Sequence, residues 1–149
     1  MWSKSARAGS SCAWGSLQSA SNQCLRYVHE YLLVFSKGNY NLPREKVERA
    51  EGRIDTIPRD DFIQHTKSIW SFATERASRV NHPAPFPVEL PKRCIEMYSF
   101  AGDVVLDPFN GSGSTCVAAK MTGRTYVGID LSEEYCAIAQ KRIDETELW

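Results

Sequence analysis

The chain has 149 residues, enough for one domain with a buried core. Its residues are 42% hydrophobic and 24% charged, which is ordinary for a soluble globular protein, and 18 basic against 18 acidic side chains leave no net charge. Composition therefore excludes a protein-wide basic field of the kind that attracts nucleic acids. No apolar run approaches the length of a membrane-spanning helix, so no membrane partner is expected.

The cysteine pattern predicts neither a metal site nor a disulfide framework. The five cysteines form no Cys-x-x-Cys pair, and their number is odd (Cys12, Cys24, Cys94, Cys116 and Cys136). The opening Met1-Trp-Ser-Lys lacks the apolar stretch of a secretory signal. We therefore expect reduced thiols, a cytoplasmic location and no bound metal.

Residues 1–40 form a first zone. Residues 8–16 are rich in Ser, Gly and Ala and show no strand or helix period, which predicts a loop. The apolar run from Glu30 to Ser36 predicts a buried strand, closed by Lys37-Gly38. The zone carries more basic than acidic side chains, which fits either a phosphate-facing surface or an ordinary solvated face.

Residues 41–80 form a second, polar zone. Charges of both signs nearly cancel there, and two prolines, Pro43 and Pro58, interrupt it. No stretch is periodic enough to predict an element, so we interpret the zone as an insertion or a small variable subdomain.

Residues 81–149 alternate helices and strands in a regular order. The proline-rich 81–87 segment predicts extended chain, followed by a helix over 88–101 with Leu90, Cys94, Met97 and Tyr98 on one face. A strand over 104–107, apolar without alternation, is expected to be buried on both sides. A small-residue helix over 114–122, a strand over 125–130 and a helix capped by Ser132 complete the order. This predicts an α/β fold with parallel strands.

A glycine turn, Gly111-Ser-Gly113, joins the first of these strands to its helix. Such a turn lets the backbone approach a ligand, although a tight turn without a ligand would look the same. A dinucleotide site would need a further glycine at position 116, where Cys116 stands, and a phosphate loop would need Gly-Lys. Asp107 and Asp130 follow the two strands, and acids there favour a neutral or cationic ligand with a ribose.

Three segments carry a family resemblance when taken together. They are His82-Pro-Ala-Pro-Phe-Pro-Val-Glu-Leu-Pro91, Leu106-Asp-Pro-Phe-Asn-Gly-Ser-Gly-Ser-Thr115 and Tyr126-Val-Gly-Ile-Asp130. In this order they resemble the C-terminal, cofactor-binding part of the bacterial and phage DNA methyltransferases that modify amino groups. The match is to the permuted, beta-class-like enzymes that make N4-methylcytosine or N6-methyladenine. Residues 11–16 and 29–38 also resemble segments of that class.

The resemblance implies a Rossmann-like fold, a mostly parallel sheet and S-adenosylmethionine as the cofactor. The implied cofactor-binding residues are Pro85, Phe86 and Pro87 along the pocket, Asp107, Phe109, Gly111, Ser112 and Gly113 around the methionine part, and Asp130 on the ribose. Phe86 and Phe109 could pack on the adenine or the sulfonium, since aromatic faces attract cations, or belong to an ordinary core.

One part of the family pattern is missing. These enzymes hold the flipped-out base with a tetrapeptide of a polar residue, two prolines and an aromatic residue, and this sequence contains none. In the permuted order the tetrapeptide would precede Met1, so we assign no catalytic residue. We expect a sheet that is incomplete at its N-terminal side and a chain that is a fragment or one half of a split enzyme.

The resemblance also implies a division of labour and a set of partners. Residues 1–40 would end the catalytic half, 41–80 would be a DNA-reading insertion and 81–149 would be the cofactor half, within one structural domain. The implied partners are double-stranded DNA, a second chain that supplies the missing motif and a cognate restriction endonuclease. The alternatives are a non-catalytic module that binds S-adenosylmethionine or a decayed remnant that binds nothing, and a methyltransferase for RNA, protein or a small molecule.

Overall fold

The computed structural model describes residues 1–3, 29–38, 54–72 and 86–147. The chain divides into two compact units, one of residues 1–35 with 67–74 and the other of residues 36–66 with 75–149. The expectations of a loop over 8–16 and of extended chain over 81–85 lie outside the described residues.

The described residues of the smaller unit contain three strands of two residues each. β1 (Trp2–Ser3) lies in the middle, antiparallel to β2 (His29–Glu30) and parallel to β3 (Trp70–Ser71). The chain terminus supports the pairing, because the Met1 amino group donates to the carbonyl of Ser68 at 3.0 Å and the Trp70 amide donates to the carbonyl of Met1 at 2.8 Å. Trp70 is buried.

The prediction of a buried strand over 30–36 is wrong. Beyond Glu30 the backbone pairs with no described strand, and Leu33 and Phe35 are 75% and 87% exposed. A buried strand needs hydrogen-bonded neighbours and covering layers, and an apolar run alone supplies neither.

The larger unit contains α2 (Arg59–His65), α4 (Glu89–Tyr98), β4 (Val104–Asp107), α5 (Ser114–Met121), β5 (Thr125–Gly128) and α6 (Glu133–Asp144). β4 and β5 pair in parallel, in a register that runs from Val104 opposite Thr125 to Asp107 opposite Gly128. The α/β order and the parallel pairing expected from the sequence are confirmed. α2 was missed, although Pro58 before it and two acids in its first turn are start signals.

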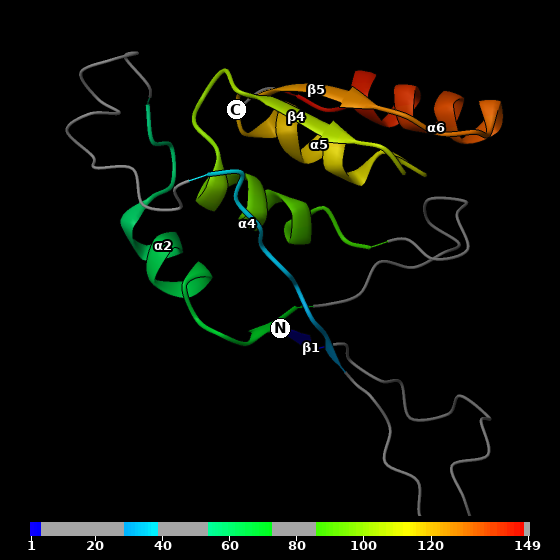
Figure 1. Cartoon of the computed structure of the whole chain (residues 1–149). Helices are drawn as coiled ribbons and strands as arrows, with labels where there is room; N and C mark the ends of the chain where they lie inside the picture. The colour runs from blue at the N-terminus through cyan, green and yellow to red at the C-terminus, as the bar shows by residue number, and fades with distance from the viewer. Residues whose placement is uncertain (4–28, 39–53, 73–85, 148–149) are drawn as a thin grey trace, which may run out of the picture. The chain divides into compact units, whose positions relative to one another are not determined.

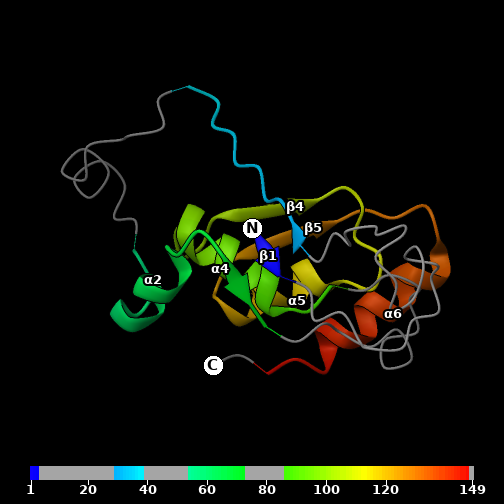
Figure 2. The ribbon, with the colours of Figure 1, turned by 90° about the horizontal axis from the view of Figure 1, so that it is seen from below.

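The core of this unit is formed by α5 against the sheet. Figure 1 shows α5 along one face of β4 and β5, and in Figure 2 α4, α5 and α6 lie beside one another. Ala118 and Ala119 are fully buried and pack with Ile95 of α4, while Cys116 and Val117 pack with Ile143 of α6. The small side chains of α5 allow this close approach of three helices and two strands.

The other face of the two strands is open, which contradicts the prediction that β4 is buried on both sides. Val104, Leu106, Val127 and Ile129, here called the open sheet face, are 68%, 60%, 47% and 51% exposed. Val105 and Tyr126 point the opposite way, into the core under α5. β4 is apolar on both faces, but the described helices cover only one of them.

Two helix predictions met different outcomes. In α4 the buried residues are Pro91 and Ile95, whereas Leu90, Cys94 and Met97 are only partly buried and Tyr98 is exposed, so the buried face is not centred on the predicted residues. Ser132 caps α6 as predicted, with its hydroxyl accepting from the Tyr135 amide at 3.3 Å. None of the helices in the described ranges is both long and apolar enough to span a bilayer.

Candidate functional site

The glycine turn and the acid after β5 are joined directly. The Gly111 amide donates to Oδ2 of Asp130 at 2.8 Å, and the Ser132 amide donates to Oδ1 at 2.9 Å. The predicted ribose-binding acid therefore also shapes the turn and starts α6.

The turn needs glycine at its last position for two reasons. Gly113 has φ +82°, in the left-handed region that side chains rarely adopt. A Cβ placed on it would also lie 2.7 Å from Cβ of Ala139 on α6, closer than real contacts allow. The absence of a side chain at Gly113 thus allows the start of α5 to pack closely against α6.

Arg142 fixes the middle of the turn from α6. Its Nη1 donates to the carbonyl of Ser112 at 2.5 Å and to the Ser112 hydroxyl at 3.0 Å. Ser112 is buried, so its predicted contact with a cofactor would be made by backbone and not by its hydroxyl. The guanidinium satisfies polar atoms that burial would otherwise leave without partners.

A compact layer lies under the turn. The backbone amide of Asn110 donates to the carbonyl of Ile129 at 2.9 Å. The Cys116 thiol donates to the side-chain oxygen Oδ1 of Asn110 at 3.2 Å. A Cβ on Gly128 would meet the Asn110 side chain at 2.6 Å and Sγ of Cys116 at 2.8 Å. Close packing of helix on strand is therefore made possible by a glycine on the strand, while Cys116 stands where a dinucleotide fold would have its third glycine.

Burial also determines the state of the Cys116 thiol. Desolvation, assisted by the nearby charge of Asp107, raises the pKa of Cys116 to about 11. The thiol is therefore neutral at physiological pH and serves as a packing and hydrogen-bonding group.

Asp107 and Phe109 stand at the end of β4. The Phe109 amide donates to Oδ1 of Asp107 at 3.0 Å, which turns the chain toward the glycines. The Phe109 ring is 86% exposed. The alternative of an ordinary core residue is thus wrong for Phe109, which presents an aromatic face beside the predicted ligand site.

The segment before α4 approaches the same turn. The carbonyl of Phe86 accepts from the Ser114 hydroxyl at 3.0 Å, and Pro87 is buried. Pro85 lies outside the described residues. The structure thus brings the turn, Asp107, Asp130 and Phe86 to one end of the sheet.

Sequence reasoning missed three residues that organise this end, Asn110, Gly128 and Arg142. Asn110 and Gly128 stand inside the quoted motifs, so their position beside the turn and the second acid was the available signal. No feature of the sequence pointed to Arg142, because a single arginine on an amphipathic helix is usually solvated.

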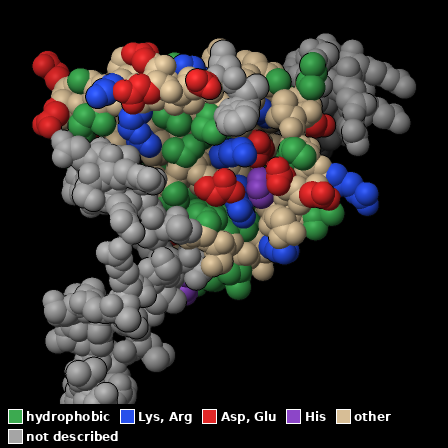
Figure 3. All heavy atoms as spheres, turned by 180° about the vertical axis from the view of Figure 1, so that it is seen from behind, with side chains coloured by type: hydrophobic (Ala, Val, Ile, Leu, Met, Phe, Trp, Pro, Cys, Tyr) green, Lys and Arg blue, Asp and Glu red, His purple; other side chains and the backbone are tan. Residues whose placement is uncertain are grey.

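The described surface shows no single-sign patch in the view from behind. Acidic and basic side chains are interspersed there (Figure 3). Among the described side chains of this face there is no basic stripe that would follow a phosphate backbone.

Fold and site together define an α/β protein with a glycine turn at the carboxyl ends of two parallel strands. The DNA methylase family model for N6 and N4 modification matches residues 1–141. The chain therefore belongs to this DNA methylase family, which confirms the family inferred from the motifs, while the permuted order and the C-terminal position stay predictions.

Two curated relatives illustrate the match. The chain is 47% identical over 142 residues to the orphan methyltransferase M.BamHII of Bacillus amyloliquefaciens, covering 78% of this chain and 54% of that protein. It is 34% identical over 131 residues to the type II methyltransferase M.MthZI of Methanothermobacter thermautotrophicus, covering 84% and 37% respectively. The chain thus spans about half or less of the length of these relatives.

Solved structures agree on the fold. TTHA0409 of Thermus thermophilus, described as a DNA modification methylase, superposes with a TM-score of 0.57 at 37% identity over 73% of this chain and 42% of that chain. The same protein solved with S-adenosyl-L-methionine gives a TM-score of 0.54 at 36% identity, over 73% of this chain and 40% of that one. The Rossmann-like α/β fold expected from the motifs is confirmed.

Proposed function

We propose that this chain binds S-adenosylmethionine and forms the cofactor-binding part of a site-specific DNA methyltransferase acting on the amino group of cytosine or adenine. Membership of the DNA methylase family supports the reaction class. The observation that carries the proposal is the hydrogen bond from the Gly111 amide to Asp130, because it joins the glycine turn to the acid at the end of the neighbouring strand.

The residues at this end suit the cofactor chemically. Asp130 would accept from the ribose hydroxyls, and Gly111, Ser112 and Gly113 with Asp107 would surround the methionine part. The exposed ring of Phe109 would face the adenine or the sulfonium, and Pro85, Phe86 and Pro87 would line the approach. When bound, S-adenosylmethionine supplies an electrophilic methyl group.

In this proposal the chain contributes positioning and not base recognition. Its own residues hold the methyl donor in one orientation, which removes much of the entropic cost of bringing two reactants together. The flipped base would be held by the Pro-Pro-aromatic tetrapeptide, which this sequence does not contain. We therefore assign cofactor binding to this chain and base holding to another segment.

The open sheet face is consistent with a covering layer that another segment or a second chain supplies. Parallel sheets are normally covered on both faces, yet Val104, Leu106, Val127 and Ile129 are exposed. We infer that the catalytic half of a methylase, on a second chain or in the same longer chain, covers this face and extends the sheet beside β4. In that arrangement residues 1–40 end the catalytic half, 41–80 read DNA and 81–149 hold the cofactor.

Double-stranded DNA is the proposed macromolecular partner, with a cognate restriction endonuclease as a functional one and the cytoplasm as the location. The second candidate is a module that binds S-adenosylmethionine without transferring its methyl group. The absent tetrapeptide favours this candidate if no second half is supplied.

Two measurements separate these functions. Calorimetry of the full chain with S-adenosylhomocysteine tests the cofactor site, and the absence of binding heat would contradict the proposal. Transfer of labelled methyl groups to mixed double-stranded DNA, with RNA and protein as competing acceptors, tests the reaction. Transfer is expected only when a methylase segment that carries the tetrapeptide is added to the chain. Binding without transfer even in that mixture supports the non-catalytic module, and transfer to RNA or protein alone would overturn the assignment to DNA.

A further inference from the structure

A second pocket lies at the opposite end of the β4–β5 sheet from the glycine turn. Its volume is about 590 Å³, and its walls include Ala101 just before β4 and Gly123 just before β5. Asp107 and Asp130, by contrast, come at the other ends of these strands. The pocket is therefore separate from the proposed cofactor site.

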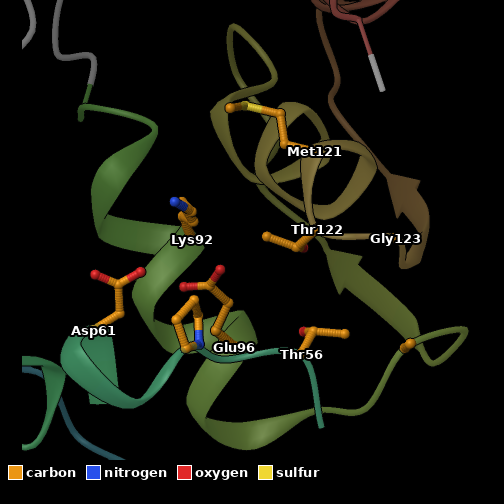
Figure 4. Close-up of a pocket in the computed structure, with 9 residues that line it drawn as sticks. Thr56, Asp61, Lys92, Glu96, Met121, Thr122 and Gly123 are labelled. Carbon is orange, nitrogen blue, oxygen red and sulfur yellow. The ribbon is translucent and has the colours of Figure 1, made fainter. Parts of the chain in front are cut away.

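Charged side chains from two helices converge on this pocket. Figure 4 shows Asp61 of α2 beside Lys92 and Glu96 of α4, with the Glu96 carboxylate placed centrally. Thr122 and Met121, at the end of α5, form the opposite wall. The pocket thus combines two carboxylates and one ammonium group with an apolar thioether.

One carboxylate oxygen of Glu96 is buried without a hydrogen bond. The side chain is only 8% exposed, and its Oε2 accepts from no group in the described parts of the chain. The Nδ1 atom of His65 lies 3.7 Å from Oε2, which is longer than a hydrogen bond. A buried carboxylate in this state costs free energy that a suitable donor would recover.

His65 does not supply the missing positive charge. Burial, followed by the charge of Arg93, lowers the pKa of His65, so its imidazole is neutral at pH 7. Burial likewise raises the pKa of Glu96. Lys92 and Asp61 are only half-buried, so water can solvate their charges, and the Glu96 carboxylate is the group that needs a partner.

We propose that this pocket binds a small organic cation, an ammonium or guanidinium group on a short aliphatic stem. Glu96 and Asp61 accept hydrogen bonds from its N–H groups, and Met121 contacts the stem. A guanidinium has five donors in a planar fork and suits paired carboxylates especially well. The inference is independent of methyl transfer and of the cofactor site.

The methionines provide a direct test in the full chain. The sequence holds three of them, Met1, Met97 and Met121, so methyl-labelled methionine gives three NMR signals. Titration with propylguanidinium should shift the Met121 signal saturably in the millimolar range and leave Met97 nearly unchanged. Propylurea has a similar shape but no charge and should give no saturable shift. An unmoved Met121 signal, or equal shifts with both compounds, would overturn the proposal.

Substitutions test which carboxylates bind the cation. Glu96→Gln and Asp61→Asn should each weaken propylguanidinium binding at least tenfold, whereas Glu134→Gln on the exposed side of α6 should not change it. If Glu96→Gln fails to fold, the half-buried Asp61 still decides the result. Unchanged affinity in every folded variant would refute the site.

The source of the cation is distinguished by two further probes. 1,4-Diaminobutane represents a free small molecule, and an acetylated tripeptide with a central arginine represents a protein side chain. Tighter binding of either one assigns the source, and failure of both to shift Met121 would contradict the proposal.

Discussion

Asp130 and Gly111 are joined by a hydrogen bond of 2.8 Å between a carboxylate and a backbone amide that are far apart in the sequence. The acid expected to hold a ribose is thus part of the structure that shapes the glycine turn. Ligand affinity and local stability are therefore coupled at this residue, and a substitution there changes both.

Replacement of Asp130 separates these two effects. Asp130→Ala removes two backbone hydrogen bonds and should lower the free energy of unfolding by about 1–3 kcal/mol, with a similar loss in affinity for S-adenosylhomocysteine. Asp130→Asn keeps one carbonyl acceptor and should recover part of the stability but less of the affinity. Urea unfolding and calorimetry measure the two quantities. Unchanged affinity in both variants would contradict the ribose assignment.

Gly113→Ala tests the close approach of α5 and α6. The substitution combines a left-handed φ of +82° with a Cβ 2.7 Å from Ala139, so we expect a loss of about 2–4 kcal/mol in unfolding free energy.

Gly123→Ala is the matched control for this test. Gly123 has φ +73°, and a methyl group added there would meet nothing within 4 Å, so only the backbone cost of about 1 kcal/mol should appear. Equal losses in the two variants would show that contact with Ala139 is unimportant.

The sequence predicted the features that depend on local chemistry. The parallel strands, the Ser132 cap and the turn at Gly111–Gly113 follow from residue type and spacing alone, and the structure contains each of them. The cofactor-binding roles of Asp107, Phe109 and Asp130 stay predictions, although the structure brings these residues to one end of the sheet.

Features that depend on tertiary neighbours were not predictable. The apolar run over 30–36 and the outer face of β4 both indicate burial by composition, yet each is exposed where no described element covers it. The buried face of α4 centres on Ile95 because Ala118 and Ala119 leave room there, and spacing within α4 alone does not reveal this.

Arg124 is a buried cation that joins three segments of the larger unit. It is 4% exposed, and its guanidinium donates to the Ser99 carbonyl at 2.6 Å, to the Thr56 hydroxyl at 2.5 Å and to the carbonyl of Thr122. Arg124→Lys cannot reproduce this planar set of bonds and should cost about 2–3 kcal/mol of unfolding free energy.

A control for Arg124 is available on the surface. Arg59 is exposed at the start of α2, so Arg59→Lys should change stability by less than about 0.5 kcal/mol. Denaturant unfolding of the two variants makes the comparison. Equal effects would show that the Arg124 bonds contribute little.

Cys116 gives a test that depends on pH. Its pKa of about 11 in the folded protein lies above the ordinary value of 9.0, so the folded state holds the thiol proton more tightly than the unfolded state does. This contribution to stability is complete below pH 9 and is lost as the pH rises toward 11.

Alkylation rates give a second test of the buried thiol. At about pH 8, iodoacetamide should modify the exposed Cys136 much faster than the buried Cys116, as measured by peptide mass spectrometry. Comparable rates would mean that Cys116 is accessible, and the layer that it forms with Asn110 and Gly128 would then not be closed in solution.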